Sequence, residues 1–242
     1  MENLMGSSEV NDIRDALSKL STPLITDASL RIGLSPRVAP FGIRPLIPGR
    51  LVVGQALPVR HYGSADILLE AIATSRSGDI LVIDNDGRTD EACIGDLIAL
   101  EAQAHELSGI VLWGCYRDTT ELIQIGLPIF SYGTCPIGPQ RLDTRSSDAL
   151  NSARFGSFEV TKEDLVFADG DGVIFVPCTS LEELLGIAHT IWQTERQQAE
   201  AVRAGETLLA QFRFDEYLNR RTMDAAYTFR KHLRILNRTI EE

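Results

Sequence analysis

Two short segments, Gly95-Asp96 and Arg117-Asp118, combine residue types that bind a small acid and a divalent cation. An arginine guanidinium can hold a carboxylate through two parallel hydrogen bonds, and an aspartate offers hard oxygen to a cation. Gly95 begins a predicted helix, whose first N–H groups and dipole attract anions, and its missing side chain permits close approach. Each segment also has a structural alternative, because a helix start can bind water alone and Arg117-Asp118 can be a local ion pair.

The spacing of the two segments favours a shared site. Twenty residues separate Asp96 from Arg117, and they predict one helix followed by one returning strand. In a unit of that length the start of the helix and the end of the next strand lie at the same edge of the sheet. We therefore expect a metal ion and a small acid to bridge Asp96, Arg117 and Asp118.

The elements around these segments alternate between strand and helix. Apolar runs predict strands at residues 51–53, 79–84, 109–113 and 128–131, and helical spacing predicts helices at residues 64–72, 94–107 and 119–125. Ser64 is the predicted cap of the first of these helices. Continuous apolar runs suit strands buried on both faces, which indicates a layered α/β fold. Residues 155–177 change to short segments typical of antiparallel strands.

Helices are predicted at both ends of the chain. One begins at Val10 and is stopped by Pro23, and a long one reaches Arg203 and ends at Gly205. We predict a flexible N-terminus over residues 1–9, one domain over residues 10–205, and a helical tail over residues 206–242. Residues 213–238 hold seven basic and three acidic residues. This basic face can be a solvated helix surface, a nucleic-acid patch or a docking surface for an acidic neighbouring subunit.

Composition narrows the class of protein. The 242 residues are 44% hydrophobic, enough for a sizeable core, and the net charge of −11 argues against a nucleic-acid partner. No apolar run approaches the roughly 20 residues that span a membrane, and no signal peptide is evident, so we expect a cytoplasmic protein without membrane contact.

Several other chemistries lack their sequence patterns. The histidines form no metal-binding pair, and neither a G-x-S-x-G nor a phosphate-loop motif occurs, which excludes histidine zinc sites, serine hydrolases and nucleotide hydrolases. The cysteines show no C-x-x-C spacing and are predicted to be buried thiols. They are Cys93, Cys115, Cys135 and Cys178.

Motifs across most of the chain carry a resemblance to a known family. They are Thr26-Asp27-Ala28, Gly54-Gln55-Ala56, and residues 78–84, 92–99, 114–118, 128–130 and 168–173. With these motifs, the chain resembles the family that includes 4-hydroxy-4-methyl-2-oxoglutarate aldolase and the RraA regulators of RNase E. The most specific element is an aspartate, twenty intervening residues and an Arg-Asp pair, which Asp96, Arg117 and Asp118 reproduce.

The resemblance implies a β/β/α swivelling-type domain, RraA-like, assembled as a homotrimer or hexamer. It implies a class II pyruvate aldolase that cleaves small 2-keto acids, with oxaloacetate decarboxylase activity. Asp118 would bind Mg²⁺ or Mn²⁺ directly and Asp96 would bind it through water. Arg117 and the backbone at Gly95 would hold the substrate carboxylate, together with the amides of Leu97 and Ile98.

Two implications of the resemblance stay open. Glu195 or Glu200, on the predicted long helix, would reach the site of a neighbouring subunit. The alternative function is a non-catalytic regulator that binds a ribonuclease or helicase. Members of that branch typically lack the second aspartate of the Arg-Asp pair, whereas this chain keeps Asp118, so the resemblance favours the enzyme.

Overall fold

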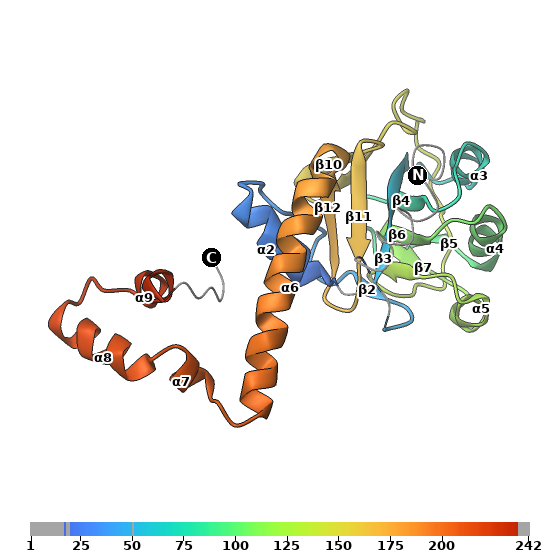
Figure 1. Ribbon diagram of the computed structural model, residues 1–242. Helices are drawn as coiled ribbons and strands as arrows, with labels where there is room; N and C mark the ends of the chain where they lie inside the picture. The colour runs from blue at the N-terminus through green and yellow to red at the C-terminus, as the bar shows by residue number, and fades with distance from the viewer. Residues whose placement is uncertain (1–16, 18–19, 50, 237–242) are drawn as a thin grey trace. The chain divides into compact units, whose positions relative to one another are not determined.

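The computed structural model describes residue 17 and residues 20–49 and 51–236 (Figure 1). The chain divides into two compact units. Of the described residues, the sheet unit contains those in 21–23 and 36–181, and the helical unit contains residues 17, 20, 24–35 and 182–236. The predicted flexible segment 1–9 and nearly all of the predicted helix from Val10 lie outside the described residues. The predicted domain boundary at residue 205 stays a prediction.

A mixed eight-stranded sheet runs through the sheet unit in the order β1-β12-β11-β3-β4-β6-β8-β2. Its strands are β1 (Arg37–Val38), β2 (Arg44–Pro45), β3 (Val52–Arg60), β4 (Ile80–Asp84), β6 (Gly109–Trp113), β8 (Ile129–Ser131), β11 (Asp164–Ala168) and β12 (Val173–Pro177). The central strands β3, β4, β6 and β8 are parallel, whereas β11, β12, β1 and β2 pair antiparallel. Both the parallel region and the later antiparallel region agree with the prediction.

Three layers enclose two apolar cores. Helices α3 (Asp66–Ala73), α4 (Asp96–Ala104) and α5 (Thr119–Ile125) cover one face of the sheet, and the hairpin of β9 (Ser152–Phe155) and β10 (Phe158–Thr161) contributes to the core on the other. Alternate residues of β4 divide between the cores, since Leu81 and Ile83 join the helices and Ile80 and Val82 join the hairpin. The layered β/β/α fold is thereby confirmed.

A two-stranded parallel sheet of β5 (Ala92–Ile94) and β7 (Cys115–Tyr116) lies outside the main sheet. The sequence did not predict β5, and the helix expected from residue 94 begins two residues later, at Asp96. The predicted Ser64 cap is wrong, because α3 starts at Asp66 with Ala65 in the cap position and no side-chain cap hydrogen bond.

The helical unit confirms the predicted helical tail. After a 3₁₀ turn (Cys178–Ser180), α6 (Leu181–Arg203) ends where it was predicted to end, and Gly205 has the left-handed φ of +100° that suits a helix stop. The tail helices are α7 (Leu208–Gln211), α8 (Phe214–Met223) and α9 (Phe229–Ile235). Helix α2 (Thr22–Arg31) was not predicted, and Pro23 lies in its first turn, where proline is tolerated.

Basic residues of the tail cover its own aromatic residues. Arg220 and Lys231 lie over the ring of Tyr227, and Arg221 lies over the ring of Tyr217. Such cation–π contacts stabilise the tail locally. Part of the predicted basic face therefore packs within the tail itself.

Two further predictions concern cysteines and membranes. All four cysteines are free; Cys93, Cys115 and Cys135 are buried, as predicted, and Cys178 is partly buried. Among the described helices, none has the length and apolar character needed to cross a membrane.

Candidate active site at the carboxyl edge of the parallel strands

The two predicted segments lie at two neighbouring helix starts. Gly95 is the N-cap of α4, directly after β5, and Asp118 is the N-cap of α5, directly after β7. The parallel pairing of β5 with β7 holds these helix starts beside each other, and the backbone N–H of Arg117 donates to the carbonyl oxygen of Ile94 at 3.0 Å. The structure thus brings together the segments that the sequence placed at one edge.

The Asp118 carboxylate lies directly against Gly95. A Cβ atom at Gly95 would collide with Oδ2 of Asp118. The same oxygen lies 3.4 Å from the backbone N of Asp96 and 3.5 Å from Nε of Arg117. Asp118 has left-handed backbone angles (φ 64°, ψ 44°), an uncommon conformation for a residue with a side chain and one that clusters at functional sites.

Arg117 presents its guanidinium group to solvent. Its side chain is 51% exposed, and its one described ion partner is the adjacent Asp118 at 3.5 Å. On the other side, a Cβ atom at Gly138 would lie 2.9 Å from Nη1 of Arg117, so the guanidinium packs against the bare backbone there. The guanidinium is therefore held between Asp118 and Gly138 but stays open to solvent, so it can bind a carboxylate.

The first turn of α4 carries the predicted amide donors. The Leu97 N–H donates to Oδ1 of Asp96 at 2.8 Å, so the Asp96 side chain occupies one of these donors. Ile98 lies in the same turn, where N–H groups have no partner within the helix. A bound carboxylate would therefore take the Leu97 N–H only after Asp96 turned away.

The side chains fit a cation that keeps most of its water ligands. Among the described residues, no three His, Cys, Asp or Glu side chains are grouped to hold a metal ion. Asp118 and Asp96 offer one or two hard oxygen donors, the number with which Mg²⁺ usually binds alongside water and substrate. The Asp118 oxygen lies against Gly95, next to the start of α4 where Asp96 is the first residue. A closed zinc site, which needs four protein ligands, does not fit.

The two glutamates implied by the resemblance lie on α6, in the helical unit. Glu195 is partly buried and lies 4.0 Å from the neighbouring Arg196, and Glu200 is exposed. Their reach toward the site of another subunit stays a prediction.

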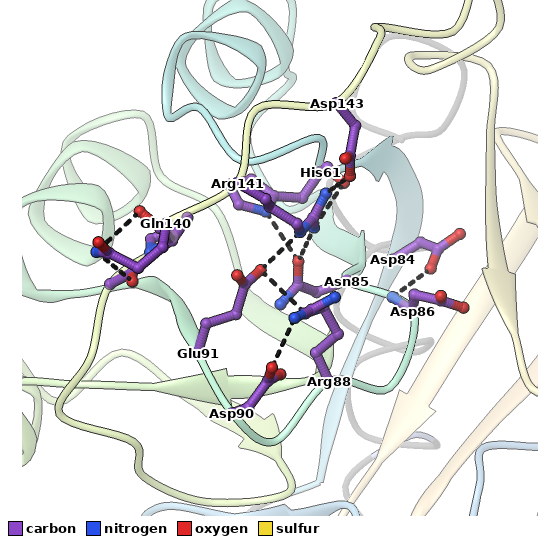
Figure 2. A network of polar contacts seen from close by, with 12 residues as sticks. His61, Asp84, Asn85, Asp86, Arg88, Asp90, Glu91, Gln140, Arg141 and Asp143 are labelled. Carbon is purple, nitrogen blue, oxygen red and sulfur yellow. Dashed lines mark hydrogen bonds and ion pairs between the residues drawn. The ribbon is translucent and has the colours of Figure 1, made fainter.

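A second polar cluster, which the sequence did not predict, lies at the ends of β3 and β4 (Figure 2). Arg60, Asp84 and Trp113 pair in register as the last residues of β3, β4 and β6. His61 and Asn85 follow directly and are joined by a hydrogen bond of 2.8 Å between Nδ1 and Oδ1. A cavity of about 420 Å³ opens here. It is lined by Arg60, His61, Asp84, Asp86, Arg88, Arg141, Asp143, Arg154 and Glu159.

Burial shifts the pKa of two groups in this cluster. It lowers the pKa of His61, with the positive charge of Arg141 acting in the same direction. Burial also raises the pKa of Asp84, against the hydrogen bonds that its carboxylate accepts from the backbone of Asp86 and Arg154. The cavity therefore contains a neutral imidazole near neutral pH.

The fold and the paired helix starts define the class of protein. The chain belongs to the RraA-like family (Aldolase/RraA), whose sequence profile matches residues 22–175. This range contains both polar clusters.

Known relatives include proteins with different names. DlpA from Legionella pneumophila is 26% identical over 213 residues, or 86% of this chain and 34% of DlpA, so this chain spans about a third of that protein. A Bacillus cereus protein, provisionally named 4-hydroxy-4-methyl-2-oxoglutarate aldolase, is 34% identical over 121 residues, or 50% of this chain and 75% of that one.

A solved structure with the same fold comes from Streptomyces coelicolor. RraAS2, described as an unusual member of the RNase ES inhibitor RraA protein family, has a TM-score of 0.66 and 26% identity. The match covers 75% of this chain and 92% of RraAS2. The family thus includes proteins named as lyases and proteins named as ribonuclease inhibitors.

Proposed function

We propose that this protein is a divalent-metal-dependent class II pyruvate aldolase, a carbon–carbon lyase that cleaves 2-keto acids similar to 4-hydroxy-4-methyl-2-oxoglutarate. The observation that carries the proposal is the position of the Asp118 carboxylate over Gly95, beside Arg117 and the first turn of α4. It brings together an oxygen ligand for a metal ion, a guanidinium that can bind a carboxylate, and the first-turn amides of α4, of which the Leu97 N–H is held by Asp96 until that side chain turns away.

Each residue has a proposed role. Asp118 binds Mg²⁺ or Mn²⁺ directly, and Asp96 binds it through water. Arg117 holds the carboxylate of the keto acid, with the Leu97 and Ile98 amides, while Gly95 leaves room for the close approach. The divalent ion, when bound, supplies Lewis-acid polarisation of the 2-keto oxygen.

The same site supports decarboxylation of oxaloacetate. Retro-aldol cleavage and decarboxylation both leave the electron pair of the broken carbon–carbon bond on the carbon beside the keto group. Arg117 would orient the carboxylate at the keto end in both reactions, so one arrangement of side chains serves both. We propose a homotrimer or hexamer as the working assembly, as the resemblance implies.

The test measures pyruvate release from 4-hydroxy-4-methyl-2-oxoglutarate and from oxaloacetate, with Mg²⁺ or Mn²⁺ added. We expect activity that EDTA abolishes and that Asp118→Ala lowers at least about 100-fold, because metal positioning and charge stabilisation are lost together. Asp171→Ala, which changes an exposed carboxylate outside both clusters, is the matched control. Activity that persists in EDTA or in Asp118→Ala would contradict the proposal.

A second candidate is a non-catalytic regulator that binds a ribonuclease. The similarity to RraAS2, described as a member of a ribonuclease inhibitor family, favours this candidate. It is tested by adding the wild-type protein and Asp118→Ala to a ribonuclease E assay. Inhibition by both proteins, with no lyase activity in the wild type, would reverse the order of the two candidates.

A further inference from the structure

The hydrogen bonds of Asn85 fix the tautomer of His61. Oδ1 of Asn85 accepts from Nη2 of Arg141 at 2.8 Å, and an arginine can only donate. Nδ1 of His61 lies 2.8 Å from the same oxygen and must therefore carry the hydrogen. A neutral ring protonated at Nδ1 has a lone pair at Nε2.

The neighbours of Asn85 hold it in this orientation. Asn85 is fully buried, and its Cβ atom would be only 3.0 Å from a Cβ placed on Gly114. Arg141 is held in turn by Glu91, with 3.0 Å between Nε and Oε1, and by the carbonyl oxygen of His61 at 3.3 Å. Glu91 is itself 4% exposed. A series of polar contacts through Asn85, Arg141 and Glu91 thus holds the imidazole at its Nδ1 side. Functional histidines are commonly oriented in this way.

The hydrogen bond to Asn85 uses Nδ1 of His61 and leaves Nε2 for a ligand. His61 is 7% exposed and lines the cavity, and within the described part of the chain Nε2 has no hydrogen-bond partner. A neutral imidazole lone pair accepts a hydrogen bond and repels another lone pair. A ligand in this cavity must therefore present a hydroxyl or an N–H group to His61.

Arg154 is the most exposed of the arginines that line the cavity. Its ion partner is Asp86, and the two side chains are 49% and 67% exposed, so solvent screens the pair and leaves it weak. Its guanidinium lies 5.4 Å from the ring centroid of Trp113, which keeps the group in place when the partner changes. Arg141, by contrast, is 18% exposed and paired with the buried Glu91. A ligand carboxylate would therefore displace Asp86 rather than Glu91.

We propose that this cavity is a second binding site, which takes a small hydroxylated carboxylic acid. The ligand hydroxyl donates a hydrogen bond to Nε2 of His61, and its carboxylate pairs with Arg154 in place of Asp86. The site requires neither a metal ion nor Asp118. Its occupancy is thus separable from the lyase activity proposed above.

Malate and succinate make a matched pair of probes, because they share two carboxylates and differ by one hydroxyl group. Binding is measured by calorimetry on the full chain in EDTA. We expect malate to bind about three- to tenfold more tightly than succinate, the size of one net hydrogen bond. We also expect ¹⁵N NMR of the histidine rings to show His61 protonated at Nδ1 and its Nε2 resonance to shift with malate.

His61→Asn is the sharpest variant, since its amide can keep the donor to Asn85 while Nε2 is lost. It should remove the preference for malate and leave succinate affinity unchanged, whereas Arg154→Gln should weaken both ligands. His105→Asn, at an exposed histidine, is the matched control. Arg117→Gln should leave malate binding unchanged, which separates this site from the proposed keto-acid site.

Several results would overturn the proposal. They are equal affinity of the wild type for the two acids, a malate preference that survives His61→Asn, loss of malate binding in Arg117→Gln, and a His61 ring protonated at Nε2. The wild-type comparison and the NMR measurement do not depend on the folding of any variant. Absence of saturable binding up to about 10 mM malate would also reject the site.

Discussion

Oδ2 of Asp118 occupies the space that a side chain at Gly95 would need. The relationship joins residues 23 positions apart through the short pairing of β5 with β7. It explains why a glycine precedes α4, because any larger residue would push the carboxylate away from the helix start. The requirement concerns space alone, since the backbone of Gly95 is extended (φ −142°), which any residue can adopt.

Gly95→Ala should therefore leave the fold intact and displace Asp118. We expect kcat/KM for pyruvate release to fall about 100-fold, the effect of a shift of about 1 Å in a positioned group. Gly170→Ala is the control, because no atom lies within 4 Å of a Cβ placed there. Equal losses in both variants would show that the Gly95 contact has no special role.

Arg117→Lys tests whether the guanidinium fork or only the positive charge is needed. Lysine keeps the charge but cannot make two parallel hydrogen bonds to a carboxylate. We expect KM for the keto acid to rise about tenfold with a smaller change in kcat, as for a group that binds the unreactive end. An unchanged KM, measured in steady state, would place the substrate carboxylate elsewhere.

His61 should make stability depend on pH in a predictable direction. Burial lowers its pKa below the value of about 6.5 that the unfolded chain shows, so the unfolded state binds the proton first. The neutral ring therefore contributes its full stability above about pH 6.5 and loses it as the pH falls, by at most about 1.4 kcal/mol per unit. Asn85, Arg141, Glu91 and Asp66 are the groups that influence this titration.

Urea unfolding between pH 7.5 and 5.5, values chosen to bracket the ordinary histidine pKa of about 6.5, measures this effect. The wild type should lose more stability over that interval than His61→Asn. The raised pKa of Asp84 acts with the opposite sign, and the comparison of the two proteins removes its contribution. Parallel losses in the two proteins would mean that His61 does not titrate as described.

His232 should be a structural residue of the tail. Its Nε2–H donates to the carbonyl oxygen of Phe212 at 2.8 Å, and its Nδ1 accepts from the hydroxyl of Tyr227 at 3.1 Å. His232→Phe would leave the Phe212 carbonyl without this donor and the Tyr227 hydroxyl hydrogen without its acceptor, although that hydroxyl still accepts from Arg220 at 3.2 Å. A buried group that loses its partner costs about 1–3 kcal/mol. Hydrogen exchange of α7, α8 and α9 should therefore accelerate about tenfold or more.

The double variant His232→Phe/Tyr227→Phe removes the hydroxyl whose hydrogen loses its acceptor in His232→Phe, together with the contact that this hydroxyl makes with Arg220. It should recover part of the lost protection, which a simple packing defect would not. If the double variant recovers no protection from hydrogen exchange, the loss in His232→Phe results from altered packing and not from lost hydrogen bonds.

Strong local signals account for the parts of the fold that the sequence predicted. The buried run Ile80–Ile83 predicted β4 to within one residue. The helical spacing of Thr119–Ile125 predicted both ends of α5. β5 was missed because three residues, Ala92–Ile94, are too few to show an alternating pattern. β5 forms because it pairs with β7, and the local sequence of neither segment predicts that pairing.

In the candidate site, too, only what local sequence determines could be predicted. The sequence placed Gly95 and Asp118 at one edge because a single βα unit connects them. His61, Asn85, Glu91 and Arg141 come from separate loops, and none belongs to a motif with a recognisable spacing. Only the tertiary fold brings them together, so the second cluster could not be predicted. The roles proposed for the first cluster stay predictions.

The pairing of β5 with β7 has one further consequence. Because the backbone of Arg117 is bonded to that of Ile94, the starts of α4 and α5 are tied into one body before any ligand arrives. A ligand that contacts both Asp96 and Asp118 therefore meets a preorganised surface and loses little affinity to reorganisation. Only the Asp96 side chain must rotate, a rearrangement of picoseconds to nanoseconds that would leave association limited by diffusion and orientation.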